Sequence, residues 1–121
     1  MDTIAWAAGL FEGEGSIVSF GVRKHQRSLT LAMTDEDIVL RFAATIGVGK
    51  IYGPYGYTSS TSRRREHHKQ YWRWSVSDKE GVIAAASALL PFMGARRKAK
   101  MVEAIEAVNL LQESTRARTK R

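Results

Sequence analysis

Two glutamates separated by a glycine end the most apolar stretch of this 121-residue sequence, GLFEGEGS at residues 9–16. Carboxylates are hard oxygen ligands, and in a basic, phosphate-binding protein they favour Mg²⁺. On a helix, Glu12 and Glu14 lie about 160° apart, so they do not form a local acid–base pair. Two copies of the helix would bring two Glu14 side chains together, and like charges at short range need a cation between them.

The glycines of this stretch offer a way to bring two copies together. Gly9 and Gly13 are four residues apart and share one side of the helix with Trp6 and Leu10. A stripe without side chains lets a second helix backbone approach closely, although each glycine costs roughly 1 kcal/mol relative to alanine. We therefore expect a homodimer about a two-fold axis through this side. The alternative is that Gly9 and Gly13 are only a weak helix position and a C-cap.

The overall charge favours a polyanionic partner. The chain has 19 Lys and Arg against 12 Asp and Glu, a net charge of +7, which is typical of proteins that bind nucleic acid or an anionic membrane. A basic protein without such a partner is the alternative. Cysteine is absent, which excludes disulfides and thiolate metal sites. No apolar run approaches a membrane span, and the N-terminus lacks the basic region of a secretory signal. We expect no membrane partner and a cytoplasmic, non-secreted protein encoded by a cell, a phage or an organelle.

The periodicity predicts elements that would position the glutamates. Helices are expected from Thr3 to about Gly13, from a Thr34 cap to Gly47, from a Ser77–Glu80 capping box to the break at Pro91, and from Ala95 to Gln112. Strand pairs are expected at residues 16–33 and on either side of residues 58–69, and residues 115–121 as a frayed basic tail. Hairpins between helices indicate an α+β fold with an antiparallel sheet in a single domain, 1–121.

The segment WAAGLFEGEGS resembles the LAGLIDADG motif of homing endonucleases. Residues 7–15 cover its nine positions, with Ala7 in place of the leading leucine and glutamate at both acidic positions. The resemblance continues through MTDED, IGVGKIYGPYG, WRWSVSD and LLPFMGARRKAK, and so covers about residues 3–112.

This resemblance implies a fold and an activity. It implies an αββαββα domain whose saddle-shaped, four-stranded antiparallel sheet enters the DNA major groove, followed by a C-terminal helix. Single-motif members are homodimers, so it implies a site-specific endonuclease that cuts both strands of a near-palindromic DNA and leaves 3′ overhangs. Mg²⁺ is the expected cofactor, with Ca²⁺ or Mn²⁺ able to take its place in a crystal, and no small-molecule substrate is expected. The alternative is a non-cleaving DNA-binding regulator or an RNA maturase on the same scaffold.

The resemblance also assigns roles near the motif. Glu14 and the Gly13 carbonyl correspond to metal ligands, and Glu12 to a residue that holds the helix end and its neighbour in the dimer. Arg96 and then Lys98 are the expected catalytic cations, with a solvated helix face as the alternative. Asp35 matches a polar residue at the active site, although helix initiation is its competing role. The predicted dimer interface is therefore Trp6, Gly9, Leu10, Glu12 and Gly13.

The sheet is expected to read the DNA sequence through side chains that contact base edges, for example arginine with guanine. Alternation predicts that Trp72, Trp74 and Val76 face the core. In the first strand, alternation turns Val18, Phe20 and Val22 inward, whereas counting from the motif puts Val18 and Phe20 on the DNA face, and both possibilities stay open. His67 and His68 are expected to be polar loop residues and not metal ligands. The predicted DNA-contacting residues are Ser19, Arg23, Lys24, Arg27, Arg63, Arg64, Arg65, Tyr71, Arg73 and Ser75.

Overall fold

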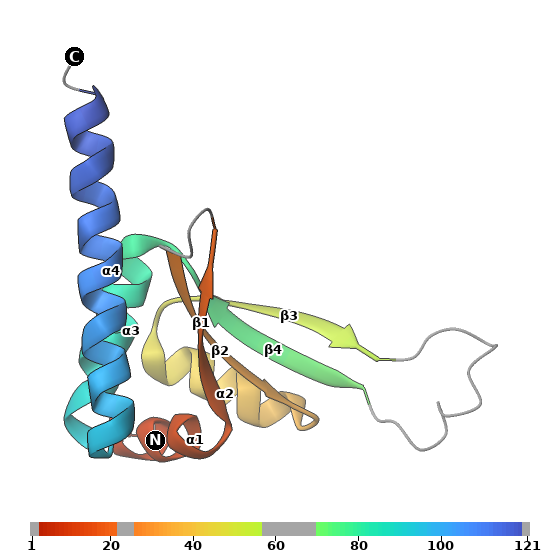
Figure 1. Cartoon of the computed structure of the whole chain (residues 1–121). Helices are drawn as coiled ribbons and strands as arrows, with labels where there is room; N and C mark the ends of the chain where they lie inside the picture. Colours follow the sequence, from red (N-terminus) through yellow and green to blue (C-terminus); the bar gives the residue numbers. More distant parts are fainter. Residues whose placement is uncertain (1–2, 22–25, 57–69, 120–121) are drawn as a thin grey trace.

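The computed structural model describes residues 3–21, 26–56 and 70–119, with side chains up to residue 110 (Figure 1). Four strands pair antiparallel in the order β1-β2-β4-β3. The predicted α+β class and the αββαββα order with a C-terminal helix are confirmed. The elements are α1 (Ile4–Glu14), β1 (Gly15–Phe20), β2 (Gln26–Met33), α2 (Glu36–Ile46), β3 (Lys50–Tyr55), β4 (Tyr71–Val76), α3 (Lys79–Leu89), the short 3₁₀ helix η3 (Leu90–Phe92) and α4 (Ala95–Thr119).

Helix α1 begins where its sequence predicts. The Thr3 hydroxyl accepts a hydrogen bond from the Trp6 backbone N–H at 3.1 Å, which satisfies one of the free donors of the first turn. At the end of α2, Gly47 adopts the left-handed conformation at φ 85° and closes the helix.

Two predicted caps are wrong by one residue. Helix α2 has Asp35 at its N-cap in place of Thr34. Helix α3 has Asp78 in place of Ser77, and its carboxylate accepts from the Gly81 N–H at 2.8 Å. In both segments a hydroxyl and a carboxylate are adjacent, and both residue types are good caps.

Helix α4 is longer than predicted. It continues to Thr119 instead of ending near Gln112. Residues 115–119, which were expected to belong to a frayed tail, are therefore helical. No glycine or proline interrupts residues 95–119, and alanine, arginine and leucine are strong helix formers. The C-terminal part of α4 extends well past the other elements in Figure 1.

The core lies between the helices and one face of the sheet. Phe11 of α1, Phe42 of α2 and Trp74 of β4 are fully buried. The Phe42 ring lies between the other two, with its centroid 6.4 Å from that of Phe11 and 4.9 Å from that of Trp74. The Trp74 indole N–H donates to the Val48 carbonyl at 2.9 Å, which satisfies its buried polar group. The prediction that the β4 tryptophans face the core is confirmed, with Trp74 buried and Trp72 half-buried.

The register of the sheet settles the face of each strand residue, because directly paired residues of antiparallel strands point to the same side. Ile17 pairs with Leu29, and Leu29 pairs with Val76, so these residues share the helix-covered face. The other face is uncovered and is here called the open face. Its described residues are Ser16, Val18, Phe20, Gln26, Ser28, Thr30, Ala32, Lys50, Tyr52, Tyr55, Tyr71, Arg73 and Ser75.

Strand β3 forms one edge of the sheet and is irregular. Its pairing with β4 shifts in register between Tyr52 and Tyr55, around Pro54. In Figure 1, β3 and β4 extend away from the helices. In the ranges that the structure describes, none of the helices combines the length and the apolar character that a bilayer crossing requires.

Candidate functional site

The open face carries cationic and aromatic side chains. Lys50 and Arg73 are exposed on it, and no Asp or Glu occurs among its described residues. Four of its large apolar or aromatic side chains are also solvent-exposed, although such residues normally fill cores. Cations, hydroxyl groups and rings together form a surface suited to a polyanion whose bases can be contacted. These four residues are Val18, Phe20, Tyr52 and Tyr71.

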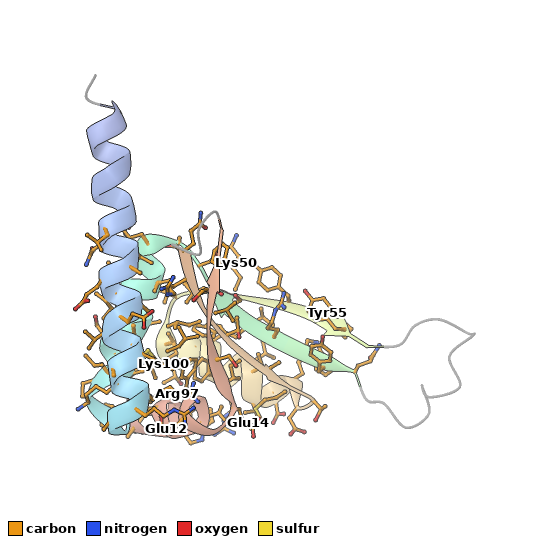
Figure 2. All side chains as sticks on the ribbon, in the orientation of Figure 1. Glu12, Glu14, Lys50, Tyr55, Arg97 and Lys100 are labelled. Atoms are coloured by element: carbon orange, nitrogen blue, oxygen red, sulfur yellow. The ribbon has the colours of Figure 1, made fainter. Side chains whose placement is uncertain are left out.

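Arg73 lies within an aromatic cluster on this face. Its guanidinium carbon is 5.8 Å from the Tyr52 ring centroid and 5.3 Å from that of Tyr55. The Tyr55 and Tyr71 rings are themselves 5.4 Å apart. Tyr55 and Lys50 lie at different points along β3 (Figure 2), and in the register Lys50 pairs with Ser75, two residues along β4 from Arg73.

Glu14 is the last residue of α1, and β1 starts at the next residue. The side chain is exposed, as is Gly13 before it. Gly15 is required at the turn into the strand, because a Cβ there would overlap the Phe11 ring. Glu12 lies near α4, whereas Glu14 lies near the start of β1 (Figure 2).

The glycine side of α1 is uncovered. A Cβ added at Gly9 or at Gly13 would have no neighbouring atom within 4 Å. Trp6 and Leu10 on the same side are only half-buried, whereas Ala7, Ala8 and Phe11 on the opposite side are buried. The α1 helix therefore buries one side within this chain and leaves the glycine side free for contact with another molecule.

Arg97 connects the start of α4 to the end of α1. Its guanidinium donates to the carbonyls of Gly15 at 2.9 Å and Glu12 at 3.0 Å, and its Nε lies 3.8 Å from a Glu12 carboxylate oxygen. The other Glu12 oxygen accepts from the Gly94 N–H at 3.0 Å. The predicted role of Glu12 in holding the helix end is consistent with these contacts. The two carbonyls that Arg97 binds flank Gly13 and Glu14.

A groove of about 540 Å³ lies beside this connection. Arg96 lines the groove with Glu12, as predicted for a cation near the motif, but neither Glu14 nor Lys98 lines it. Lys98 is exposed, and its N–H begins α4 by donating to the Gly94 carbonyl at 2.8 Å. The remaining lining residues are Gly15, Ser16, Ile17, Gly94, Ala95, Arg97 and Lys100.

Two residues predicted to contact DNA lie on the helix-covered face of the sheet and not on the open face. Arg27 pairs with Glu103 of α4 at 2.9 Å, and its side chain is 13% exposed, so it stabilises the helix-covered side. Ser19 pairs with Arg27 in the register and shares that side. Val18 and Phe20 point to the open face instead, as counting from the motif indicated, and the inward placement from alternation is wrong.

The other predicted residues divide into three groups. Tyr71, Arg73 and Ser75 lie on the open face as expected from alternation in β4. Asp35 is exposed at the N-cap position of α2, where its side chain makes no capping hydrogen bond. Outside the described residues lie Val22, Arg23, Lys24, Arg63, Arg64, Arg65, His67 and His68.

Sequence reasoning did not select Arg97, Lys100, Lys50, Tyr52 or Tyr55. Lys50 and Tyr52 alternate within KIYGPY, which is the signal that could have placed them on the same face as Arg73. The contacts of Arg97 join residues more than 80 positions apart, so local spacing carried no signal for them.

The end of α1 offers some, but not all, of the oxygen ligands that a metal site requires. Glu14 offers one exposed carboxylate and Gly13 a carbonyl, both of them hard oxygen ligands suited to Mg²⁺. Over residues 3–21, 26–56 and 70–119, no group of three or more His, Asp or Glu side chains is arranged to hold an ion. A complete site at this position would take its further oxygens from water, from phosphates or from a second subunit.

Comparison with known proteins finds matches among solved structures. No protein-family model matches the chain, and no curated protein matches it. Among solved structures, the homing endonuclease I-CvuI in complex with its target, in the presence of Ca²⁺, superposes with a TM-score of 0.69 at 16% identity. That match covers 93% of this chain and 69% of the I-CvuI chain.

Two further structures extend this comparison. The archaeal intron-encoded homing endonuclease I-Vdi141I, complexed with DNA, gives a TM-score of 0.65 at 14% identity over 91% of this chain and 69% of its own. The LAGLIDADG meganuclease I-CpaMI, bound to uncleaved DNA, gives 0.68 at 13% identity over 95% of this chain but 38% of its own. The helices and the four-stranded sheet of this chain thus have the fold of the LAGLIDADG homing endonucleases.

Proposed function

We propose that this chain is one subunit of a homodimeric, site-specific endonuclease that cuts both strands of a near-palindromic DNA and leaves 3′ overhangs. The observation that carries the proposal is the open face, an uncovered sheet surface with Arg73, Lys50 and exposed rings and without described acids. DNA is the partner that combines a dense negative backbone with base edges in a groove wide enough for strands. The DNA complexes of proteins with the same fold support this choice of partner.

The uncovered side of α1 supports the homodimer. Gly9 and Gly13 leave room for a second backbone, and Trp6 and Leu10 supply apolar surface beside them. Two α1 helices in contact there bring both Glu14 residues toward the two-fold axis. Each subunit then supplies half of the carboxylates needed for one cut on each strand.

Glu14, with the Gly13 carbonyl, is the proposed holder of a divalent metal, Mg²⁺ in the cell. When bound, such an ion supplies neutralisation of the phosphate charge. This chain's own residues hold the arrangement: Arg97 fixes the backbone on both sides of Gly13 and Glu14. Arg96, exposed at the groove beside them, is the proposed partner of the cleaved phosphate, and Lys98 adds positive charge nearby.

A cleavage selection on a randomised, near-palindromic duplex library tests this function. Wild-type protein with Mg²⁺ should enrich one sequence with a fixed stagger between the two cuts. Glu14→Gln should abolish cleavage and retain DNA binding, because it removes the ligand charge with little change in shape. Glu80→Gln makes the same chemical change at an exposed position in the first turn of α3, so it serves as the matched control and should cut normally.

The outcomes separate the alternatives. Cleavage by Glu14→Gln would show that the metal ligand is misassigned. Specific retention of duplexes without cleavage by the wild type would support a non-cleaving regulator. Preferential retention of RNA over duplex DNA would instead support a maturase.

A further inference from the structure

Arg73 differs from Arg27 and Arg97 in how its charge is held. Aromatic rings flank it, at 5.8 Å for Tyr52 and 5.3 Å for Tyr55, and no described residue of the open face is acidic. Arg27 and Arg97, by contrast, are paired with Glu103 and Glu12 on the helix-covered side. The charge of Arg73 is therefore not neutralised by any carboxylate of the described chain.

The hydrogen-bond donors of Arg73 remain available. A guanidinium carries five N–H donors in a planar fork, and attraction to a ring face uses the charge and not those donors. Within the described residues, its guanidinium makes ring contacts but no hydrogen bond or ion pair. The rings restrict the orientation of the fork before any ligand arrives, which lowers the ordering cost of binding.

The neighbours of Arg73 in the sheet leave one side of it clear. In the register, Arg73 pairs with Ala32 of β2 on one side and with Tyr52 of β3 on the other. The alanine contributes only a methyl group, whereas the tyrosine contributes a ring. Since β4 is a central strand of the order β1-β2-β4-β3, Arg73 lies on an inner strand of the open face and not on either edge strand.

We propose that Arg73 selects a guanine at one base-pair position in each half of the DNA target. The inference rests on the proposed function, because it requires that the open face enters the major groove. Guanine presents two acceptors, O6 and N7, on its major-groove edge, and the arginine fork matches both. A phosphate is the other bidentate acceptor, but phosphates border the groove, where the edge strands and their turns lie closer. Tyr52 and Tyr55 act as positioning residues that hold the fork.

A binding selection without metal tests the assignment apart from cleavage. A randomised duplex library is retained separately on wild-type protein, on Arg73→Lys, on Arg73→Ala, on the double variant Tyr52→Leu/Tyr55→Leu, and on Lys50→Met. The wild type should enrich guanine at one position per half-site, by roughly ten- to a hundredfold over the other bases. Arg73→Lys keeps the charge but loses the planar fork, so the guanine preference at that position alone should weaken, and Arg73→Ala, which removes both, should abolish it. The tyrosine variant should show a weaker preference at the same position.

Lys50→Met is the matched control for charge on the same face. It should weaken binding to all sequences about equally and reduce the slope of log affinity against log salt by about 1, with base preferences unchanged. The same uniform loss in Arg73→Ala, with guanine still enriched as in the wild type, would mean a phosphate contact and would overturn the assignment. A wild-type protein that enriches no duplex would overturn the proposed function and this assignment together. Circular dichroism and sedimentation of each variant confirm that the fold and the assembly are unchanged.

Discussion

Arg97 and Glu12 are joined through both main chain and side chain. The guanidinium donates to the Glu12 carbonyl at 3.0 Å, and its Nε lies 3.8 Å from the carboxylate. The same arginine lies over the Phe11 ring, 5.5 Å from its centroid, and binds the Gly15 carbonyl. One side chain from α4 thereby contacts residues 11, 12 and 15, and the backbone that presents Glu14 is fixed between these contacts.

Replacing Arg97 with methionine should destabilise the protein and loosen this helix end. The aliphatic part of the side chain is kept, but two charge-assisted hydrogen bonds are lost, and their loss should lower the free energy of unfolding by about 2 kcal/mol. Urea denaturation measures the change. Arg96→Met, which removes an exposed neighbour, should cost less than about 0.5 kcal/mol, and equal losses in the two variants would refute the structural role of Arg97.

Trp74→Phe should be among the more destabilising conservative changes in the core. It leaves the Val48 carbonyl without its donor and alters the edge contact with Phe42. We expect a loss of about 2–3 kcal/mol, measured by chemical denaturation. The half-buried Trp72 provides the comparison, since Trp72→Phe should cost less than about 1.5 kcal/mol. A larger loss at Trp72 than at Trp74 would contradict the packing described here.

The pair of Arg27 and Glu103 should give stability a dependence on acid pH. The hydrogen bond from Arg27, and then its charge, hold the pKa of Glu103 below the ordinary value of 4.5. Because the folded pKa is lowered, the contribution of the pair is present above the ordinary value and is lost as pH falls through the folded value. NMR titration should show the pKa of Glu103 rising toward 4.5 in Arg27→Gln. An unchanged pKa in that variant would show that Arg27 is not the cause.

Gly13→Leu should separate folding from assembly. A Cβ at this position meets no atom within 4 Å outside the backbone of its own helix, and leucine is a better helix former than glycine, so the monomer should fold at least as well. In the proposed homodimer the same side chain would hold the two α1 helices apart. Sedimentation should therefore find a monomer, and thermal melting should show a normal transition. The variant should neither retain nor cut DNA, and Gly13→Ala should be intermediate in dimerisation and in cleavage. A dimeric, active Gly13→Leu protein would exclude this interface.

Local periodicity was enough to predict most of the architecture. The order of helices and strands, the Thr3 cap and the buried side of β4 all follow from contacts between residues close in sequence or from alternation with a single apolar face. The same logic failed at β1, where Val18 and Phe20 are apolar but face outward. Alternation assumes that apolar residues mark the core, and a binding face that is itself partly apolar breaks that assumption.

Long-range contacts account for the other misplacements in the site. Arg27 was assigned to DNA because it lies near a basic turn, and only the packing of α4 on β2 reveals Glu103 as its partner. Arg96 was selected from its place after Pro91 and Phe92, as the family resemblance implied. Consecutive helical positions differ by about 100° in direction, and the sequence alone does not fix which of them meets α1. The aromatic surroundings of Arg73 likewise depend on how β3 is paired, including its shift in register.

The irregular pairing of β3 also bears on how the sheet avoids association with other sheets. A regular edge strand offers a row of free N–H and C=O groups, and it can template strand addition from another molecule. Here Pro54 removes one donor near the end of β3, and the shift between Tyr52 and Tyr55 breaks the regular spacing of the rest. The molecule can thus leave one sheet face bare for a ligand while its β3 edge discourages the polymerisation that such an exposed sheet would otherwise invite.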